Sequence, residues 1–182
     1  MDFRQNMLVV SGTVAFYCGF FYLNQYLFHV LPSSTGASWI SLHSAVQLFA
    51  VLLFAQWGAL GVVLGGICVA LSQTAMMSDP GTVMGTIFLS GLAPLLARQI
   101  CIGFSQIEAD LHRLSPGVLL RVAAMFAATS AGLHQLWFAW RGASDDILAG
   151  LLLMFMGDLL GTLIVLYIAK AVLSVGVRIR RG

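Results

Sequence analysis

The chain has 182 residues, of which 59% are hydrophobic and 9% are charged, and its formal net charge is +2. An ordinary soluble domain carries about 25% charged residues, so this composition excludes that class and favours lipid as the solvent. The small charge and the scattered basic residues also exclude a nucleic-acid-binding surface, which needs clustered lysine and arginine.

Apolar runs recur along the chain, and a bilayer-crossing helix needs about 20 mostly apolar residues. The first run follows Arg4 as in a signal peptide, but no small-residue cleavage site follows, so we expect a retained span. We therefore predict one domain over residues 1–182, an all-α polytopic membrane helix bundle of about six transmembrane helices. The predicted spans are Met7 to Phe28, Ser41 to Ala55, Trp57 to Ala75, Thr82 to Gly103, Pro116 to Trp140 and Ile147 to Val175.

Turn and capping signals separate most of these runs. Asp79-Pro80-Gly81 is typical of a turn, with Thr82 placed to cap the following helix. Ser115-Pro116 offers an N-cap followed by proline at the first helical position. Ser144-Asp145-Asp146 places acceptors and negative charge at the positive end of the last helix.

The second run is short for a full crossing, so it either begins nearer Ser38 or lies as a tilted or re-entrant segment. Only Gln56-Trp57-Gly58 separates it from the third run, which leaves a five-span chain as the alternative. Between the fourth and fifth runs, three apolar residues share one face of a charged stretch and predict a short helix on the membrane surface. They are Ile107, Leu111 and Leu114.

The distribution of basic residues sets the orientation of a multi-span protein, because lysine and arginine favour the cytoplasmic loops. With about six spans and a cytoplasmic N-terminus, Arg141 alone lies on the outer side. The arginines at or near the inner side are Arg4, Arg98, Arg113, Arg121, Arg178, Arg180 and Arg181. A five-span chain loses this bias. We therefore expect both termini on the cytoplasmic side.

Asp158 is the first candidate for a functional side chain. It lies about 11 residues into the last predicted span, roughly 16 Å deep and near the middle of a core of about 30 Å. Acidic residues at such depth are paired or functional, so it is either a ligand contact or proton acceptor, or a hydrogen-bonding group at a close helix crossing beside Gly157 and Gly161. Arg98 is the candidate counter-charge, although an arginine near a helix end also snorkels to the headgroups, as we expect of Lys170.

A second group of polar and aromatic side chains is placed to line a pocket open to the outer side. His134 and His43, with His29 and Asp79, form its polar part. Its aromatic walls are Trp39, Trp137 and Trp140. Imidazoles at this depth can hold a metal or haem iron, but without an HxxxH or HxxE pair we predict no metal site and leave the cofactor open. Histidine and tryptophan near an interface also occur as simple belt residues.

Two glutamines inside predicted spans, Gln47 and Gln135, need hydrogen-bond partners, and we expect these partners on neighbouring helices. A run of glycines predicts close backbone approach between helices. It comprises Gly58, Gly61, Gly65, Gly66, Gly81 and Gly85. The candidate ligand-binding residues are Asp158, Arg98, His134, His43, Gln47 and Trp137.

The sequence carries no signature of catalysis: there is no HExxH, no GxSxG, no phosphate-binding loop and no closely spaced pair of carboxylates. Cys18, Cys68 and Cys101 are an odd number without CxxC spacing, so we expect small core residues and neither disulfides nor a thiolate metal site. We predict a protein that is not an enzyme.

Three short segments carry a resemblance to a known family: Gly91 to Pro94, His134 to Phe138, and Met156 to Leu166 with its Gly-Asp-Leu-Leu-Gly element. They resemble the membrane-associated sensor domain found ahead of bacterial histidine kinases and diguanylate cyclases. That family usually has more spans and a cytoplasmic output domain. The resemblance implies a shortened, stand-alone sensor of the bacterial inner membrane that binds a small ligand or a partner membrane protein and passes any signal to a separate partner.

A second resemblance is architectural and gives the alternative functions. The chain length, the helix number and the Gly-Asp element also resemble the substrate-binding component of energy-coupling-factor vitamin transporters. In those proteins a stripe of small residues on the first helix docks the coupling subunit, and here Ser11, Ala15 and Gly19 recur every four residues. The hypotheses are thus a sensor-type binding protein, a transport component, and an accessory subunit of a larger membrane complex.

Overall fold

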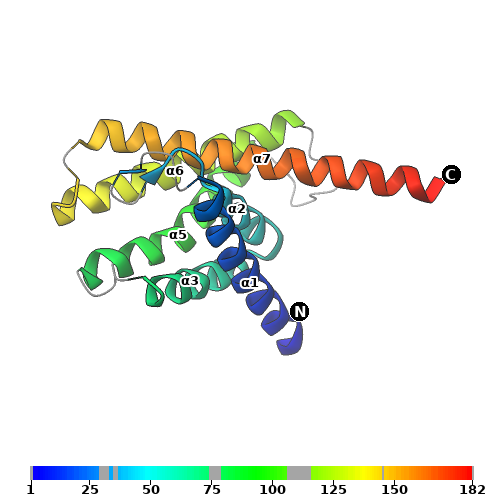
Figure 1. Cartoon of the computed structure of the whole chain (residues 1–182), viewed down its shortest axis with the longest axis horizontal. Helices are drawn as coiled ribbons and strands as arrows, with labels where there is room; N and C mark the ends of the chain where they lie inside the picture. The colour runs from blue at the N-terminus through cyan, green and yellow to red at the C-terminus, as the bar shows by residue number, and fades with distance from the viewer. Residues whose placement is uncertain are drawn as a thin grey trace.

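The computed structural model describes residues 2–28, 33–34, 37–73, 79–105, 116–144 and 146–181. These residues form six helices and one short antiparallel strand pair, in which Ser33 pairs with Ser38 and Ser34 with Ala37 (Figure 1). The elements are α1 (Phe3–Phe28), β1 (Ser33–Ser34), β2 (Ala37–Ser38), α2 (Leu42–Phe54), α3 (Gln56–Leu71), α5 (Pro80–Ser105), α6 (Pro116–Arg141) and α7 (Ile147–Arg181). The predicted all-α helix bundle is confirmed.

The number of full-length spans is smaller than predicted. Within the described part of the chain, four helices are long and apolar enough to cross a membrane: Phe3–Phe28, Pro80–Cys101, Gly117–Arg141 and Ile147–Ile168. Helices α2 and α3 are apolar but contain 13 and 16 residues, or about 20 and 24 Å against a hydrocarbon core of about 30 Å. The prediction of about six full spans is therefore corrected to about four, with two shorter apolar helices inside the bundle.

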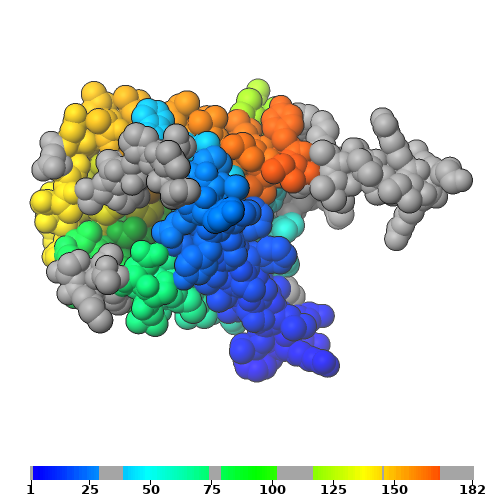
Figure 2. Space-filling view, in the orientation of Figure 1, coloured from blue at the N-terminus to red at the C-terminus, as the bar shows by residue number. Residues whose placement is uncertain are grey.

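Apolar side chains cover the outside of the bundle, as expected of a chain that uses lipid as its solvent. Figure 2 shows α1 lying along one face, where Phe16 is 65% exposed and Tyr26 is 78% exposed. Leu136 on α6 and Leu148 on α7 are exposed to a similar degree. Exposed apolar surface of this extent marks a membrane-embedded protein. The protein is a multi-span membrane helical protein.

Ala55 separates α2 from α3 by a sharp reversal of the chain. Its φ of 48° lies in the left-handed region, which costs free energy for a residue with a side chain. The reversal folds α3 back along α2 so closely that a side-chain carbon at Gly58 would overlap the carbonyl of Ala50. On the next turns of α3, Gly61 packs against Thr13 and Gly65 against Tyr17 of α1. The predicted close approach at these glycines is confirmed.

The ends of the later helices follow from local capping. Asp79, and not Thr82 as predicted, caps α5: its Oδ1 accepts the backbone N–H of Thr82 at 3.1 Å. Proline begins α6 as expected. Asp146 Oδ1 accepts the backbone N–H of Ala149 at 3.0 Å at the start of α7. The predicted surface helix over residues 107–114 lies outside the described residues.

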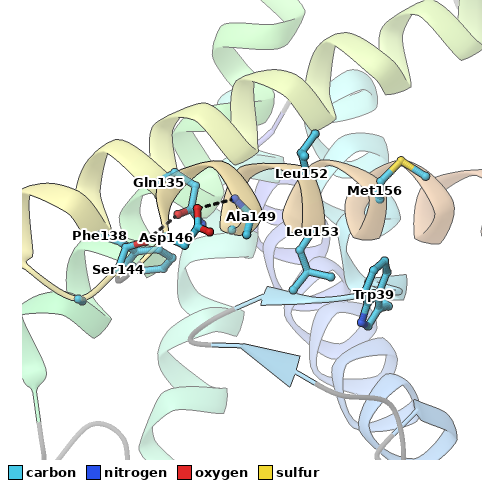
Figure 3. A pocket seen from close by; sticks show the side chains of 11 residues that line it. Trp39, Gln135, Phe138, Ser144, Asp146, Ala149, Leu152, Leu153 and Met156 are labelled. Atoms are coloured by element: carbon cyan, nitrogen blue, oxygen red, sulfur yellow. Dashed lines mark hydrogen bonds between the residues drawn. The ribbon is translucent and has the colours of Figure 1, made fainter.

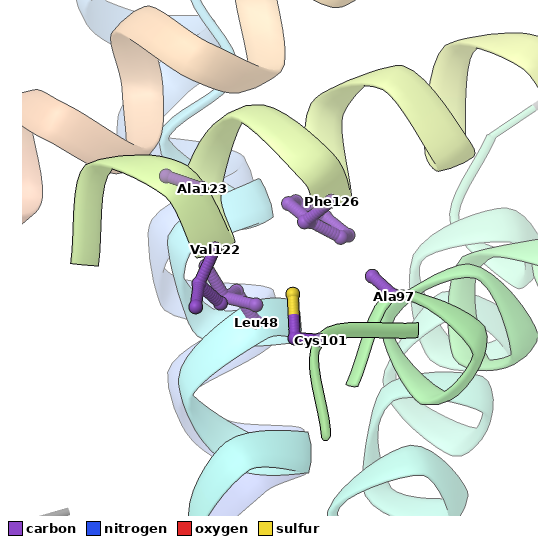
Figure 4. Close-up of a cluster of buried hydrophobic side chains, with 6 residues drawn as sticks. All are labelled: Leu48, Ala97, Cys101, Val122, Ala123 and Phe126. Carbon is purple, nitrogen blue, oxygen red and sulfur yellow. The ribbon is translucent and has the colours of Figure 1, made fainter. Parts of the chain in front are cut away.

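The helices alternate in direction, so the beginning of α1 and the end of α7 lie at the same end of the bundle (Figure 1). Helix α6 ends and α7 begins at the opposite end of the bundle. We call this the α6–α7 end. Where α2, α5 and α6 meet, a buried apolar cluster fills the space between them (Figure 4). It consists of Leu48, Ala97, Cys101, Val122, Ala123 and Phe126. Cys101 is thus a core residue as predicted, whereas Cys68 is exposed.

Candidate functional site

Helix α2 starts inside the bundle, and not at its end, because the chain before it crosses α7 partway along that helix. The backbone N–H of Ser41 donates to the carbonyl of Gly157 at 3.1 Å. A side-chain carbon at Gly161 would overlap the backbone of Ser41, so glycine is what allows the two backbones to touch. Gly157 is about 10 residues into α7, which places the crossing about 15 Å from the beginning of that helix.

Hydrogen bonds to other helices stabilise the beginning of α2. Asn24 of α1, which is buried, accepts the backbone N–H of Leu42 at 2.9 Å through its Oδ1. The hydroxyl of Ser44 donates to the carbonyl of Ser41 and lies 3.1 Å from the carbonyl of Asp158. The first backbone donors of a helix have no partner within it, and inside a membrane water does not supply one. These cross-helix bonds therefore make a helix start possible at this depth.

Asp158 lies at the centre of this crossing and is only 5% exposed. The hydroxyls of Ser130 on α6 and Ser41 before α2 lie close to its carboxyl group and interact with it. Its second oxygen, Oδ2, is buried without a hydrogen-bond partner among the described residues. The crossing thus contains an acidic group that its protein neighbours satisfy on one side only.

His43 and Gln47 lie on α2 next to this centre. The ring of His43 stands edge-on to Tyr17 and Phe21, with centroid distances of 5.5 and 5.6 Å, and its nitrogens lie 3.4 and 3.5 Å from the Ser41 hydroxyl. Gln47, which is buried, lies close to the hydroxyl of Tyr17 on α1 and interacts with it. Tyr17 is thus the neighbour of Gln47 on another helix. The hydroxyl of Ser41 therefore connects the His43 ring to the carboxyl of Asp158.

His134 of α6 is 2% exposed. Its Nδ1 lies 2.8 Å from the carbonyl of Ser130 in its own helix, and its Nε2 lies 3.3 Å from the carbonyl of Thr86 on α5. Both ring nitrogens thus face backbone oxygens. His134 joins α5 to α6, one helical turn from the serine that binds Asp158.

Two of the candidate residues lie apart from Asp158. Among the described residues the ion pair is that of Arg141 with Asp79, at 3.0 Å, and Arg98 is half-buried on α5. Trp137 donates from Nε1 to the carbonyl of Thr82 at 3.1 Å, at the α6–α7 end. The structure therefore brings Asp158, His43, Gln47 and His134 into one region, but it does not join Arg98 or Trp137 to it.

Hydrogen bonds from Thr82 and an ion pair with Arg141 lower the pKa of one acidic group outside the spans, at the α6–α7 end. The pKa of Asp79 lies below its ordinary value of 3.8, first because the hydroxyl and backbone N–H of Thr82 donate to the carboxylate and then because Arg141 lies beside it. The same guanidinium donates from Nε to the Thr82 hydroxyl at 3.0 Å. These hydrogen bonds and this ion pair connect the beginning of α5 to the end of α6.

A cavity of about 500 Å³ lies between α6, α7 and the segment that carries Trp39, close to the α6–α7 end (Figure 3). It is lined by Trp39, Gln135, Phe138, Ala143, Ser144, Asp146, Ala149, Gly150, Leu152, Leu153 and Met156. Its polar end holds Gln135, whose Oε1 accepts from the Ser144 hydroxyl at 3.4 Å. Its inner end holds Trp39 and Met156, which immediately precede the crossing along the chain.

Of the residues predicted to line an outward-facing pocket, Trp39 lines this cavity. His43 and His134 lie deeper, in the region of Asp158, and they are not among the residues that line the cavity. His29 lies outside the described residues. Within the described part of the chain, no group of three or more His, Cys, Asp or Glu side chains is arranged to hold a metal ion.

Several residues of the crossing were not identified from the sequence. They are Asn24, Ser41, Ser44, Ser130 and Thr162, all of which are buried. Asn24 carried a usable signal, because an asparagine inside a 26-residue apolar helix needs a partner. Serine and threonine carry no such signal, since their hydroxyls bond to the preceding turn of their own helix in many spans.

The comparisons with known proteins do not assign the chain to a family. No protein-family model, curated protein or solved structure matches it.

Proposed function

We propose that this protein is a non-enzymatic, sensor-type binding protein of the bacterial inner membrane, with both termini on the cytoplasmic side. Its ligand is a small amphipathic molecule that occupies the cavity beside Trp39. The observation that carries the proposal is the cavity itself, which lies between two long spans and the segment leading into the membrane-embedded start of α2.

The size and lining of the cavity favour a small organic ligand. Its volume of about 500 Å³ falls within the range of roughly 300–1,000 Å³ that is usual for such sites. Leu152, Leu153 and Met156 give one apolar wall, and Gln135 with Asp146 gives a polar end. A ligand with an apolar body and one neutral or cationic polar group matches this division, whereas an anion would meet the carboxylate of Asp146.

The position of the cavity supports a sensing role. Trp39 lies two residues before Ser41, whose backbone is tied to Gly157 of α7. A ligand that displaces Trp39 therefore also displaces the chain at the backbone contact between Ser41 and α7. Because both helices run from there toward the end of the bundle with the termini, a change at the cavity can reach a partner protein on that side.

A transport component is the second candidate, and one observation favours it. Helix α2 begins partway along α7, and interrupted or half-length helices that start inside the membrane are common around the substrate sites of secondary transporters. Uptake of the cavity ligand by proteoliposomes discriminates the two candidates. Uptake is expected of a transport component, whereas a sensor binds without net uptake.

Native mass spectrometry tests the proposal on protein released gently from its own membrane. The informative variant is Ala149→Trp, because Ala149 lines the cavity and the indole fills it. Leu148→Trp is the matched control: the neighbouring side chain is 68% exposed and does not line the cavity. We expect a small-molecule adduct on the wild type and on Leu148→Trp, and its loss in Ala149→Trp.

Two outcomes would contradict the proposal. An adduct that persists in Ala149→Trp would place the ligand elsewhere on the protein. Co-release with other polypeptides and no adduct on any variant would instead support the accessory subunit of a larger complex.

A further inference from the structure

The carboxyl group of Asp158 is buried without a positively charged partner among the described residues. It is 5% exposed, its Oδ2 has no hydrogen-bond partner among the described residues, and the ion pair in this part of the chain lies elsewhere, between Arg141 and Asp79. A buried carboxylate without a positive partner is costly in a medium of low dielectric constant. Such a group takes up a positive charge, as a proton or as a bound ion.

The groups around Asp158 suit a small cation better than an organic one. The hydroxyls of Ser41 and Ser130 interact with the carboxyl group from two other elements, and the hydroxyl of Ser44 lies 3.1 Å from the backbone carbonyl of Asp158. Oxygen atoms of this kind are the ligands that hard cations prefer, and buried carboxylates among hydroxyls also exchange protons. The backbones touch at Gly161, which leaves little space for a larger molecule.

Among the described residues, none of the neighbouring titratable groups forms an ion pair with the carboxyl of Asp158. Tyr17 of α1 interacts with Gln47, and His43 of α2 has its ring nitrogens nearest the Ser41 hydroxyl. Both nitrogens of His134 on α6 face the carbonyls of Ser130 and Thr86 and not the carboxyl. These are the titratable residues that face the centre from α1, α2 and α6 among the described residues.

We propose that Asp158 binds a small monovalent cation, a proton or Na⁺, at the crossing of α2 and α7. Occupancy neutralises the buried carboxylate and so removes the free-energy cost of an unpaired charge at the crossing. The cation thus stabilises the crossing at which α2 begins. This inference does not depend on the cavity ligand, because the site is built from residues that do not line the cavity.

Thermal unfolding of the full-length protein in lipid nanodiscs tests the proposal. The midpoint is measured in NaCl and in choline chloride of equal ionic strength, at mildly acidic, neutral and mildly alkaline pH. A Na⁺ site predicts a higher unfolding midpoint in NaCl than in choline chloride at alkaline pH. Where protons compete for the carboxylate, the apparent Na⁺ affinity should fall about tenfold for each unit by which the pH decreases. A proton site predicts a midpoint that rises on acidification and is the same in both salts.

Three variants make the test specific. Asp158→Asn keeps the shape and the hydrogen-bond acceptor but removes the charge, so both responses should disappear. Asp79→Asn removes the carboxylate of the exposed ion pair and should keep both responses. Ala149→Trp fills the cavity and should also keep them, so that a failure of the ligand proposal is distinguishable from a failure of this one.

Infrared spectroscopy and a fourth variant cover the case in which Asp158→Asn does not fold. The C=O stretch of a protonated carboxylic acid should appear on acidification of the wild type, and Na⁺ should suppress it if Na⁺ is the ion. Ser130→Ala retains the carboxyl group but removes one hydroxyl, and it should weaken the apparent cation affinity about tenfold. Equal responses of Asp158→Asn and the wild type, or no response of the wild type to either ion, would overturn the proposal.

Discussion

Replacement of Gly161 by alanine tests whether α2 begins at a backbone contact inside the bundle. The new methyl group would overlap the carbonyl of Ser41, and the obstacle is backbone that cannot rotate away. Overpacking of this kind costs about 1–3 kcal/mol, and loss of the Ser41–Gly157 hydrogen bond adds about 0.5–1.5 kcal/mol. Alanine also favours the helix over glycine by about 1 kcal/mol, which offsets part of this loss. We therefore expect a net destabilisation of about 2 kcal/mol.

The assay is reversible unfolding in mixed micelles with increasing denaturing detergent, followed by the helical circular dichroism signal. The matched control is Gly132→Ala on α6, where no atom lies within 4 Å of the added methyl group. This control should be neutral or stabilising by up to about 1 kcal/mol, because only the helix propensity changes. Equal stability of Gly161→Ala and Gly132→Ala would refute the crossing and the membrane-embedded start of α2 with it.

Two further predictions concern single polar contacts. Asn24→Leu leaves the backbone N–H of Leu42 without its acceptor, so the same assay should show a loss of about 1–3 kcal/mol. Acidification should weaken the network at the α6–α7 end: the pKa of Asp79 is lowered in the folded state, so its stabilising effect is complete above its ordinary value of 3.8 and is lost as the pH falls below it. In Asp79→Asn the unfolding midpoint should depend less on pH below 3.8 than it does in the wild type. The same pH dependence in both proteins would argue against the Thr82 and Arg141 contacts.

The membrane class and most helix positions could be predicted because they rest on local properties. An apolar run of sufficient length requires lipid or a core wherever it lies, and residues such as Pro116 and Asp146 act on the helix that they begin. The predicted runs accordingly coincide with helices. The number of full crossings was wrong, because apolarity alone does not show where a helix starts relative to its neighbours.

The residues of the site could likewise be predicted only in part. Asp158 could be identified from the sequence, since an acid inside an apolar run is costly wherever the helix packs. Its partners could not, because Ser41 and Ser130 are separated from it by long stretches of chain and resemble many other hydroxyl residues in spans. Arg98 was predicted as the counter-charge from its position in a neighbouring span, but position along a helix does not show which side faces the interior.

Composition, hydrophobic run length and capping residues thus determined that the chain is a membrane helix bundle and that one acid lies within it. Tertiary structure alone decided that α2 starts at mid-span, that Ala55 turns the chain back on itself, and that two serines meet Asp158. The physical reason is that the first set depends on the free energy of single segments in lipid. The second depends on backbone contacts between residues as distant as Ser41 and Gly157, which no single segment contains.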